Sequence, residues 1–405
     1  MDLPRLNVPP RMREAMAYDK LAGEVPRVLI LEGRYWLDAA CIHAGHALGW
    51  AMQSVPVTME GVLPRDAIAA LLQTLVEFKP DYVLSVNLSG MDVDGLFARL
   101  FEDLQLPYVT WFVDDPRTIL MDRDLYATPY SVALTWERAY ADYLSQVGFP
   151  VVHWVPLAVD PSVFNAPPVE TWAEPPAFVG NSMVHPAQTE WAWIRQHPRL
   201  AAAVTDAFEA GHVHRNSFAE GLEALLPDGL VAQLDPDQRR HAELFFFVEG
   251  TRRLRQETVT ALQPEGLTVR GDEQWRRFFE RAGGPINYTQ ALPAFYRQCE
   301  INLNVTSIQM ATTVNQRVFD CPAAGGFLLT DAQSALHDLF DVEREVACYH
   351  SLDECVDLFR WFLAHPAARR DVARRARERI LNEHTYGHRL EDITGAVREH
   401  FAGGG

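Results

Sequence analysis

Short apolar runs alternate with segments of helical spacing from Arg27 to Val155, and this alternation constrains the fold more than any other feature. Apolar runs of this length are typical of strands buried on both faces of a parallel sheet, because crossover helices cover both faces. The pattern predicts a doubly wound α/β domain. The predicted strands are Arg27–Glu32, Tyr82–Val86, Tyr108–Phe112, Val132–Thr135 and Val151–Val155, and the predicted helices are Ala39–Trp50, Leu63–Phe78, Val93–Leu104 and Arg138–Val147.

The length of the chain indicates more than one domain. Its 405 residues exceed what a single hydrophobic core usually organises. Between Pro156 and Pro176, six prolines fall within 21 positions, which is typical of a stiff, extended connection. A second alternation of strands and helices begins at Phe178, and residues 186–262 interrupt it as a long helix-forming stretch, which predicts a helical insertion. We therefore expect an N-terminal domain at 1–165, a C-terminal domain at 166–385 and a final helix within 386–405.

Composition excludes several classes of partner. The formal net charge is −18 and Lys20 and Lys79 are the only lysines, so the overall field repels nucleic acid and anionic lipid. No apolar run approaches the roughly 18 residues of a membrane-spanning helix. The first ten residues lack the pattern of an export signal, so a cytoplasmic location is expected. Neither integral membrane contact nor nucleic acid is expected as a partner, and the oligomeric state is open.

Metal binding is not expected either. The five cysteines form no C-x-x-C pair, and the histidines have no H-E-x-x-H spacing. We interpret the cysteines as small buried residues in a reducing compartment.

Several short motifs follow one another in the last third of the chain, and others precede them. They are Leu292-Pro293 with Tyr296, Ile301-Asn302-Leu303-Asn304, Arg317-Val318-Phe319-Asp320 leading to Gly325-Gly326, and Glu383-His384-Thr385-Tyr386 with His388-Arg389; upstream are Lys79-Pro80-Asp81, Asn87, Trp111–Pro116, Pro156–Asp160 with Phe164, and Phe178–Asn181. In order and spacing, this set resembles the CgeB-type (spore-maturation) glycosyltransferases. The resemblance covers most of the chain apart from 186–262.

The resemblance implies the GT-B fold, in which two Rossmann-like domains face each other across a cleft and the last helix crosses back to the first domain. It implies a glycosyltransferase that moves a sugar from a nucleotide diphosphate donor (UDP-, GDP- or dTDP-linked) to a hydroxyl of a glycan or protein acceptor. The donor would bind the C-terminal domain and the acceptor the N-terminal domain. No catalytic metal and no further cofactor are implied.

The candidate donor site lies around the segment 306–326. A predicted strand ends at Val305, a polar loop follows, and a helix is expected to begin near Val314 or Asn315. Free amides at a helix N-terminus and a guanidinium one turn later suit a diphosphate. By resemblance, Asp320 accepts hydrogen bonds from a ribose and Tyr288 lies at the nucleobase. The candidate donor-binding residues are Gly180, Asn181, Tyr288, Thr306, Ser307, Thr312, Thr313, Asn315, Arg317 and Asp320.

Catalysis is expected to involve Asp115, Asp114 and Arg317. The two aspartates follow a buried strand at the end where open α/β sheets bind ligands, and Asp115 is the candidate base for the acceptor hydroxyl. The alternative for Asp115 is a helix cap beside Pro116. Gly33-Arg34-Tyr35-Trp36, after the first strand, is expected to line the acceptor side.

One departure from related retaining enzymes leaves the mechanism open. Those enzymes often carry two glutamates seven residues apart, and the position eight before Asp320 is Thr312. Retention and inversion are both compatible with the sequence. The departure also allows a non-catalytic protein of the same fold that binds a nucleotide sugar or acts in assembly. A nucleotide-sugar 2-epimerase is a third alternative, which the scarcity of candidate acids and bases in the C-terminal domain disfavours.

Overall fold

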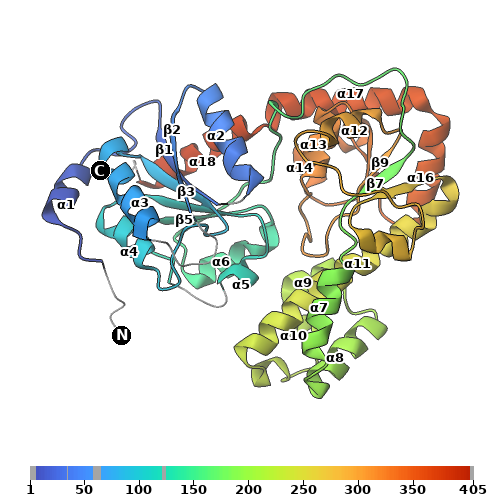
Figure 1. Cartoon of the computed structure of the whole chain (residues 1–405), viewed down its shortest axis with the longest axis horizontal. Helices are drawn as coiled ribbons and strands as arrows, with labels where there is room; N and C mark the ends of the chain where they lie inside the picture. Colours follow the sequence, from blue (N-terminus) through green and yellow to red (C-terminus); the bar gives the residue numbers. More distant parts are fainter. Residues whose placement is uncertain (1–5, 34, 58–64, 121–124, 402–405) are drawn as a thin grey trace. The chain divides into compact units, whose positions relative to one another are not determined.

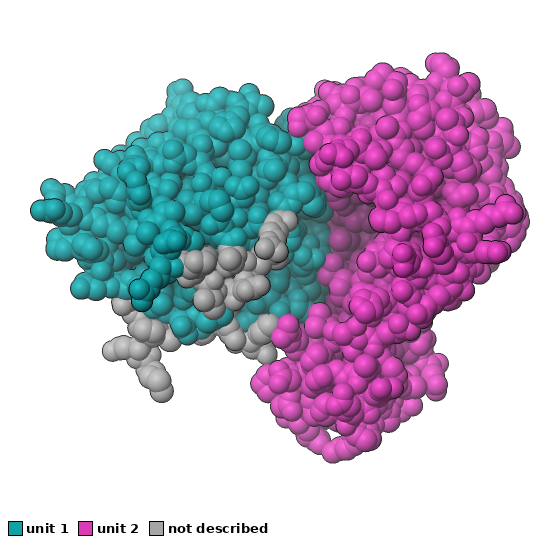
Figure 2. All heavy atoms as spheres, in the orientation of Figure 1, with its two compact units in different colours: residues 1–160, 385–405 teal, residues 161–384 magenta. Residues whose placement is uncertain are grey.

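A computed structural model describes residues 6–33, 35–57, 65–120 and 125–401. The chain divides into two compact units, which Figure 2 shows in different colours. Unit 1 comprises Met1–Asp160 and Thr385–Gly405, and unit 2 comprises Pro161–His384. The boundaries expected from the sequence were 165/166 and 385/386.

Unit 1 contains a six-stranded parallel sheet in the order β2-β1-β3-β4-β5-β6 (Figure 1). Strands β3, β4 and β5 are buried along their whole length, as expected where helices cover both faces. The strands are β1 (Arg27–Glu32), β2 (Ala51–Pro56), β3 (Tyr82–Val86), β4 (Tyr108–Phe112), β5 (Ser131–Thr135) and β6 (Val151–Trp154). The helices are α1 (Pro10–Met16), α2 (Trp36–Ala47), α3 (Arg65–Phe78), α4 (Leu96–Asp103), α5 (Pro116–Leu120), α6 (Ala141–Val147) and α18 (Tyr386–Phe401).

The sequence pattern did not indicate β2. It is an edge strand in which Met52 and Val55 alone are buried, so it lacks the continuous apolar run of its neighbours. Such a strand cannot be distinguished from a loop by hydrophobicity alone.

The last helix, α18, belongs to unit 1 although the chain reaches it only after unit 2. It packs against α2, and the buried guanidinium of Arg389 donates to the carbonyl oxygens of Pro156 and Leu157. The ring of Tyr386 lies edge-on to Trp36 and Trp111. These contacts fasten the end of the chain to the first sheet.

Unit 2 contains a five-stranded parallel sheet in the order β11-β10-β9-β7-β8. Its strands are β7 (Ala177–Val179), β8 (Thr268–Arg270), β9 (Asn302–Leu303), β10 (Leu328–Asp331) and β11 (Ala347–Tyr349). The helices around it are α12 (Leu292–Gln298), α13 (Arg317–Ala323), α14 (Leu336–Leu339), α15 (Val342–Glu345), α16 (Leu352–Ala364) and α17 (Pro366–Glu383).

The predicted insertion is helical and forms a lobe of unit 2 (Figure 1). Its helices are α7 (Val184–Ile194), α8 (Pro198–Glu209), α9 (Arg215–Glu220), α10 (Leu222–Leu225) and α11 (Pro236–Leu262). Helix α11 joins the lobe to the sheet, because Phe246 lies in the core of the lobe and Val259 in the core around the sheet. Among the described residues, no helix is both long and apolar enough to span a membrane.

Candidate functional site

The carboxyl ends of β7 and β9 define the candidate donor site of unit 2. From β7 the chain continues to β8 on one side, and β9 lies on the other side of β7. Open α/β sheets bind ligands at such a switch point, beyond the carboxyl ends of the strands. Gly180 and Asn181 follow β7 here, and the segment 304–315 follows β9.

Two arginines flank the end of β7. Arg317 donates to the carbonyl oxygen of Val179 and, at 2.5 Å, to Oδ1 of Asn304. Arg255, on α11, donates to the carbonyl oxygen of Asn181 at 2.7 Å. Both guanidinium groups lie near the ring of Phe178, 5.4 and 6.0 Å from its centroid. The two cations therefore share one small region at the switch point.

Neither arginine has an ion-pair partner among the residues that the structure describes, and the Nε atoms of both are buried without a hydrogen bond. Burial, and next the charge of Arg317, lower the pKa of Arg255 to about 10. Arg255 therefore remains cationic near neutral pH. Asp272 and Asp331 raise the pKa of Arg255 from a distance, but neither arginine forms an ion pair with a described residue. Two neighbouring cations of this kind, in a protein of net charge −18, are suited to an anionic ligand such as a diphosphate.

The helix after the polar loop begins later than predicted. Helix α13 begins at Arg317 and has only seven residues, whereas a start near Val314 or Asn315 was expected. The amides of Val318 and Phe319 already donate to carbonyl oxygens one turn earlier, both at 3.1 Å. The arginine side chains supply the positive charge at this site instead.

The polar loop after β9 is held by its own side chains. Thr306 is fully buried, and its amide and hydroxyl donate to Oδ1 of Asp331 at 3.0 and 2.8 Å. The hydroxyl of Ser307 lies 3.1 Å from that of Thr251 on α11. These two residues were expected to contact phosphate, and the structure shows them stabilising the loop.

The other loop candidates differ in exposure. Thr312 is half-buried, and its carbonyl oxygen accepts from the amide of Ala335, whereas Thr313 is fully buried. Asn315 donates to Oδ1 of Asn304 at 2.8 Å, and its own Oδ1 has no hydrogen-bond partner in the described part of the chain. Asn315 is therefore the loop residue whose side chain retains a capacity for a ligand.

Asp320 is enclosed, which corrects the expectation that it grips a ribose. Its carboxylate accepts from the hydroxyl of Tyr288 at 2.6 Å and from Gln316 at 2.7 Å, and the residue is only 1% exposed. The group positions Tyr288, whose half-buried ring lies edge-on to Phe164. Tyr288 remains the candidate contact for a nucleobase.

Gly180, at the end of β7, packs closely against Gly271. A substitution at Gly271 therefore tests whether this backbone contact fixes the end of β7. A Cβ at Gly271 would lie 2.1 Å from the carbonyl oxygen of Gly180, which also accepts from Nε1 of Trp275 at 2.8 Å. We expect Gly271→Ala to lower the free energy of unfolding by about 2–4 kcal/mol, because backbone rather than a flexible side chain must move.

Urea denaturation measures this loss. Gly284→Ala is the matched control, since no atom lies within 4 Å of the added Cβ. Equal stability of the two variants would show that the end of β7 is not held in this way.

In unit 1, the structure gives Asp115 the contacts of a cap rather than those of a base. Its carboxylate accepts from the amide of Arg117 at 3.0 Å, from the guanidinium of the same residue, and from the hydroxyl of Tyr140 at 3.1 Å. The residue is 3% exposed and precedes α5. These contacts are those of the helix cap that the sequence analysis gave as the alternative role of Asp115.

Asp114 lies in a different environment. It is half-buried, and its Oδ2 accepts from Nδ2 of Asn87 at 2.8 Å. The same amide group donates to the hydroxyl oxygen of Tyr35 at 2.9 Å. Asp114 and Tyr35 thus meet through Asn87 at the carboxyl ends of β1, β3 and β4. Trp36, also expected on this side, is 38% exposed, and Arg34 lies outside the described residues.

The sequence did not single out Asp38, which lies at the switch point of unit 1. There β1 stands between β2 and β3, the strands that follow it in the chain. Asp38 is 1% exposed, and neither carboxylate oxygen has a hydrogen-bond partner among the described residues. The hydroxyl of Ser89, which follows β3, is likewise buried without a partner. Both groups lie close to Gly33, where a Cβ would be 2.6 Å from the Ser89 hydroxyl.

Burial raises the pKa of Asp38 to about 7, and the nearby backbone of Gly33 and Tyr35 opposes the shift only in part. An unpaired buried carboxylate is costly, so its presence beside a second unpaired polar group indicates a site. Asp38 is at the start of α2. Whether its carboxylate is buried and lacks partners among the described residues depends on tertiary packing, which the sequence does not reveal. Within the described ranges, no three His, Cys, Asp or Glu side chains form a group that could hold a metal ion.

Comparison with known proteins agrees with this architecture. A family model described as "Glycosyl transferase-like" matches residues 246–395. Among curated proteins, none matches the sequence.

Three solved structures are similar over nearly their whole length. Sucrose-phosphate synthase from Thermosynechococcus elongatus is 13% identical, with a TM-score of 0.51, and the match covers 94% of this chain and 100% of that one. A glycosyltransferase from Rickettsia africae is 8% identical, with a TM-score of 0.53 and coverage of 93% and 99%. Anabaena HepE, in complex with UDP and glucose, is 9% identical, with a TM-score of 0.51 and coverage of 92% and 99%. The chain has the GT-B fold.

Proposed function

We propose that this protein is a glycosyltransferase that moves a sugar from a nucleotide diphosphate to a hydroxyl acceptor, and that it is of the CgeB type. The observation that carries the proposal is the pair of arginines, Arg255 and Arg317, at the switch point of unit 2, where no described carboxylate forms an ion pair with either. The matched family model includes both residues. A cytoplasmic location remains the expectation from the sequence.

The leaving group would be stabilised by these two residues. When the bond between the anomeric carbon and the phosphate oxygen breaks, its electron pair stays on the diphosphate. Fixed guanidinium groups lower the cost of that charge without reorganising during the step. Asn315 would donate or accept at the sugar or phosphate oxygens, and Tyr288 would contact the base, which we expect to be uracil, guanine or thymine.

The acceptor would bind unit 1 through the hydrogen-bonding groups around Asp38. The acceptor oxygen forms the new bond to the anomeric carbon, and its proton passes to the Asp38 carboxylate. Because this carboxylate is buried in the structure, the step requires that the acceptor gain access to it. A carboxylate with a pKa of about 7 suits that role near neutral pH. Asp114 and Asn87 would orient the acceptor, which we expect to be a glycan or a protein side chain. In this proposal, positive charge comes from arginines, and turnover should persist in EDTA.

A thermal-shift measurement tests the donor site directly. UDP, GDP or dTDP at a hundred times its dissociation constant should stabilise the protein by about 2.7 kcal/mol. The nucleosides uridine, guanosine and thymidine are the matched controls, since they lack the diphosphate. If no nucleotide raises the melting temperature, the donor site is absent and the proposal fails.

Turnover requires a second assay. UDP-, GDP- and dTDP-sugars are incubated with the protein in EDTA, and released nucleotide is measured. We expect release with at least one donor. Nucleotide binding without release, across donors and acceptors, would favour the non-catalytic alternative that the threonine at position 312 allows.

A further inference from the structure

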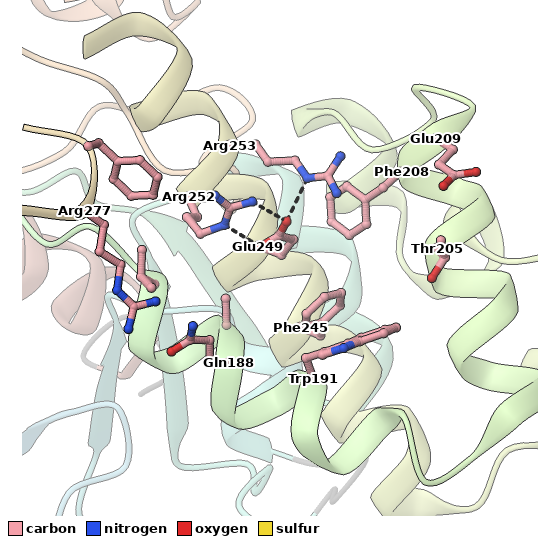
Figure 3. A pocket seen from close by; sticks show the side chains of 13 residues that line it. Gln188, Trp191, Thr205, Phe208, Glu209, Phe245, Glu249, Arg252, Arg253 and Arg277 are labelled. Atoms are coloured by element: carbon pink, nitrogen blue, oxygen red, sulfur yellow. Dashed lines mark hydrogen bonds and ion pairs between the residues drawn. The ribbon is translucent and has the colours of Figure 1, made fainter. Parts of the chain in front are cut away.

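A pocket in the helical lobe lies outside every residue assigned to the donor or the acceptor. Its volume is about 460 Å³, within the range typical of small-molecule sites. Helices α7, α8 and α11 form most of it, and Arg277 completes one side (Figure 3). Phe278 also lines the pocket. The whole pocket belongs to unit 2.

Aromatic rings form one wall of the pocket. The ring centroids of Trp191 and Phe245 are 5.4 Å apart, and Phe208 lies edge-on to Phe245 at 5.9 Å. Figure 3 shows Trp191 and Phe245 side by side, between α7 and α11. An aromatic wall of this kind fits the apolar face of a flat or puckered ring.

Glu249, one turn along α11 from Phe245, orients two arginines next to the aromatic wall. Arg252 donates to both of its oxygens, at 2.6 and 2.7 Å, and Nε of Arg253 donates at 2.8 Å. Burial alone would raise the pKa of Glu249, but the hydrogen bonds from Arg252 and Arg253 outweigh it and lower the pKa. The carboxylate therefore stays ionised and holds both side chains in place.

Two guanidinium groups retain donors for a ligand. The guanidinium of Arg253 lies 4.3 Å above the ring of Phe208, and its terminal nitrogens have no hydrogen-bond partner among the described residues. Arg277 is exposed and has no ion pair within the described part of the chain. Planar guanidinium groups bind carboxylates in a bidentate manner.

The charge of the lining favours an anion. Three arginines and two glutamates (Glu209 and Glu249) give a net charge of +1, in a chain whose net charge is −18. Gln188, Thr205 and Glu209 add groups that hydrogen-bond to hydroxyls (Figure 3). A ligand that uses all these features has a ring with an apolar face, hydroxyl groups and a carboxylate.

We propose that this pocket binds carboxylate-bearing sugar units of an acidic glycan, with one ring against Trp191 and the carboxylates of different units on Arg253 and Arg277. Binding at this pocket does not require the proposed sugar transfer. The two proposals can therefore fail separately.

Titration calorimetry with defined probes tests the pocket. The probes are trigalacturonate, the neutral trisaccharide maltotriose, and benzoate, which has a ring and a carboxylate but no hydroxyls. We expect trigalacturonate to bind at least tenfold more tightly than either of the others. Arg253→Gln and Arg277→Gln should each weaken its binding about tenfold, through loss of a charge-assisted contact.

Arg240→Gln is the matched control, because Arg240 is an exposed arginine that lies on α11, like Arg253, but outside the pocket. It should leave binding unchanged, and melting temperatures will confirm that all three variants fold. The proposal is overturned if trigalacturonate does not bind, or if Arg253→Gln and Arg277→Gln bind it as the unmodified protein does. Equal affinity for maltotriose would exclude a role for the carboxylate, and tighter binding of benzoate would exclude a sugar ligand.

Discussion

Asp38→Asn is expected to stabilise the protein above pH 7 while lowering the rate of sugar transfer by a factor of about 10²–10⁴. The two effects have one cause, the isolation of a buried carboxylate without a hydrogen-bond partner among the described residues. A gain in stability together with a loss of activity indicates a functional side chain. Loss of a structural side chain would lower both stability and activity.

The pH dependence of stability shows why Asp38→Asn should stabilise the protein at high pH. In the unfolded chain the carboxyl group has its usual pKa of 3.8, and in the folded protein its pKa is about 7. Between these values the folded state binds more protons, so this group makes stability fall as pH rises from about 4 to about 7. The asparagine variant lacks this decrease. Its advantage should be absent below about pH 4 and reach up to about 4 kcal/mol above pH 7.

Chemical denaturation at pH 4 and pH 8 measures the stability of both proteins, and donor turnover measures activity. Asp19→Asn, an exposed aspartate of the same unit, is the control and should change neither quantity. A variant that is less stable than the unmodified protein at pH 8, or that retains full turnover, would contradict the assignment of Asp38.

Removing either unpaired arginine of unit 2 should weaken nucleotide binding strongly. We expect Arg255→Ala and Arg317→Ala each to raise the dissociation constant for the preferred nucleoside diphosphate by about tenfold to a hundredfold. A charge-assisted hydrogen bond to phosphate contributes about 1.5–3 kcal/mol. The losses should not be additive, because both cations bind the same anion.

Without nucleotide, the Arg255→Ala and Arg317→Ala variants should differ in their stability. Arg255 has one hydrogen bond to the protein and lies near another cation, so its removal should change stability little. Arg317 holds Val179 and Asn304, and its removal should destabilise unit 2. Titration calorimetry and thermal denaturation separate these effects. Arg240→Gln, on the same helix as Arg255, serves as control. Unchanged nucleotide affinity in both alanine variants would exclude the proposed anion site.

Much of the fold was predictable because its signal is local. The strands Arg27–Glu32, Tyr82–Val86 and Tyr108–Phe112 have the same bounds in the structure as in the prediction. Each is a continuous apolar run, as burial on both faces requires. The insertion at 186–262 was expected to be helical because its local sequence favours helices, and the structure shows helices there.

The chemistry of the sites was less predictable, since it depends on contacts between distant segments. Thr306 and Asp320 are polar residues at positions that suit a ligand, yet both are enclosed by partners 25 and 32 residues away, respectively Asp331 and Tyr288. Asp115 is occupied by Arg117 and Tyr140. Polarity at the end of a strand does not reveal whether a side chain is satisfied within the protein.

The sequence by itself determined the alternation of strands and helices, the division into two units and the acidic charge, because these depend on local pattern and composition. Only the tertiary structure identified Asp38 and Arg255. Asp38 is one of many aspartates, and only its packing shows that it is buried without a side-chain partner among the described residues. Arg255 reaches the end of β7 because α11 runs from the lobe to the sheet. Burial and charge isolation are properties of assembled segments, and a linear pattern does not encode them residue by residue.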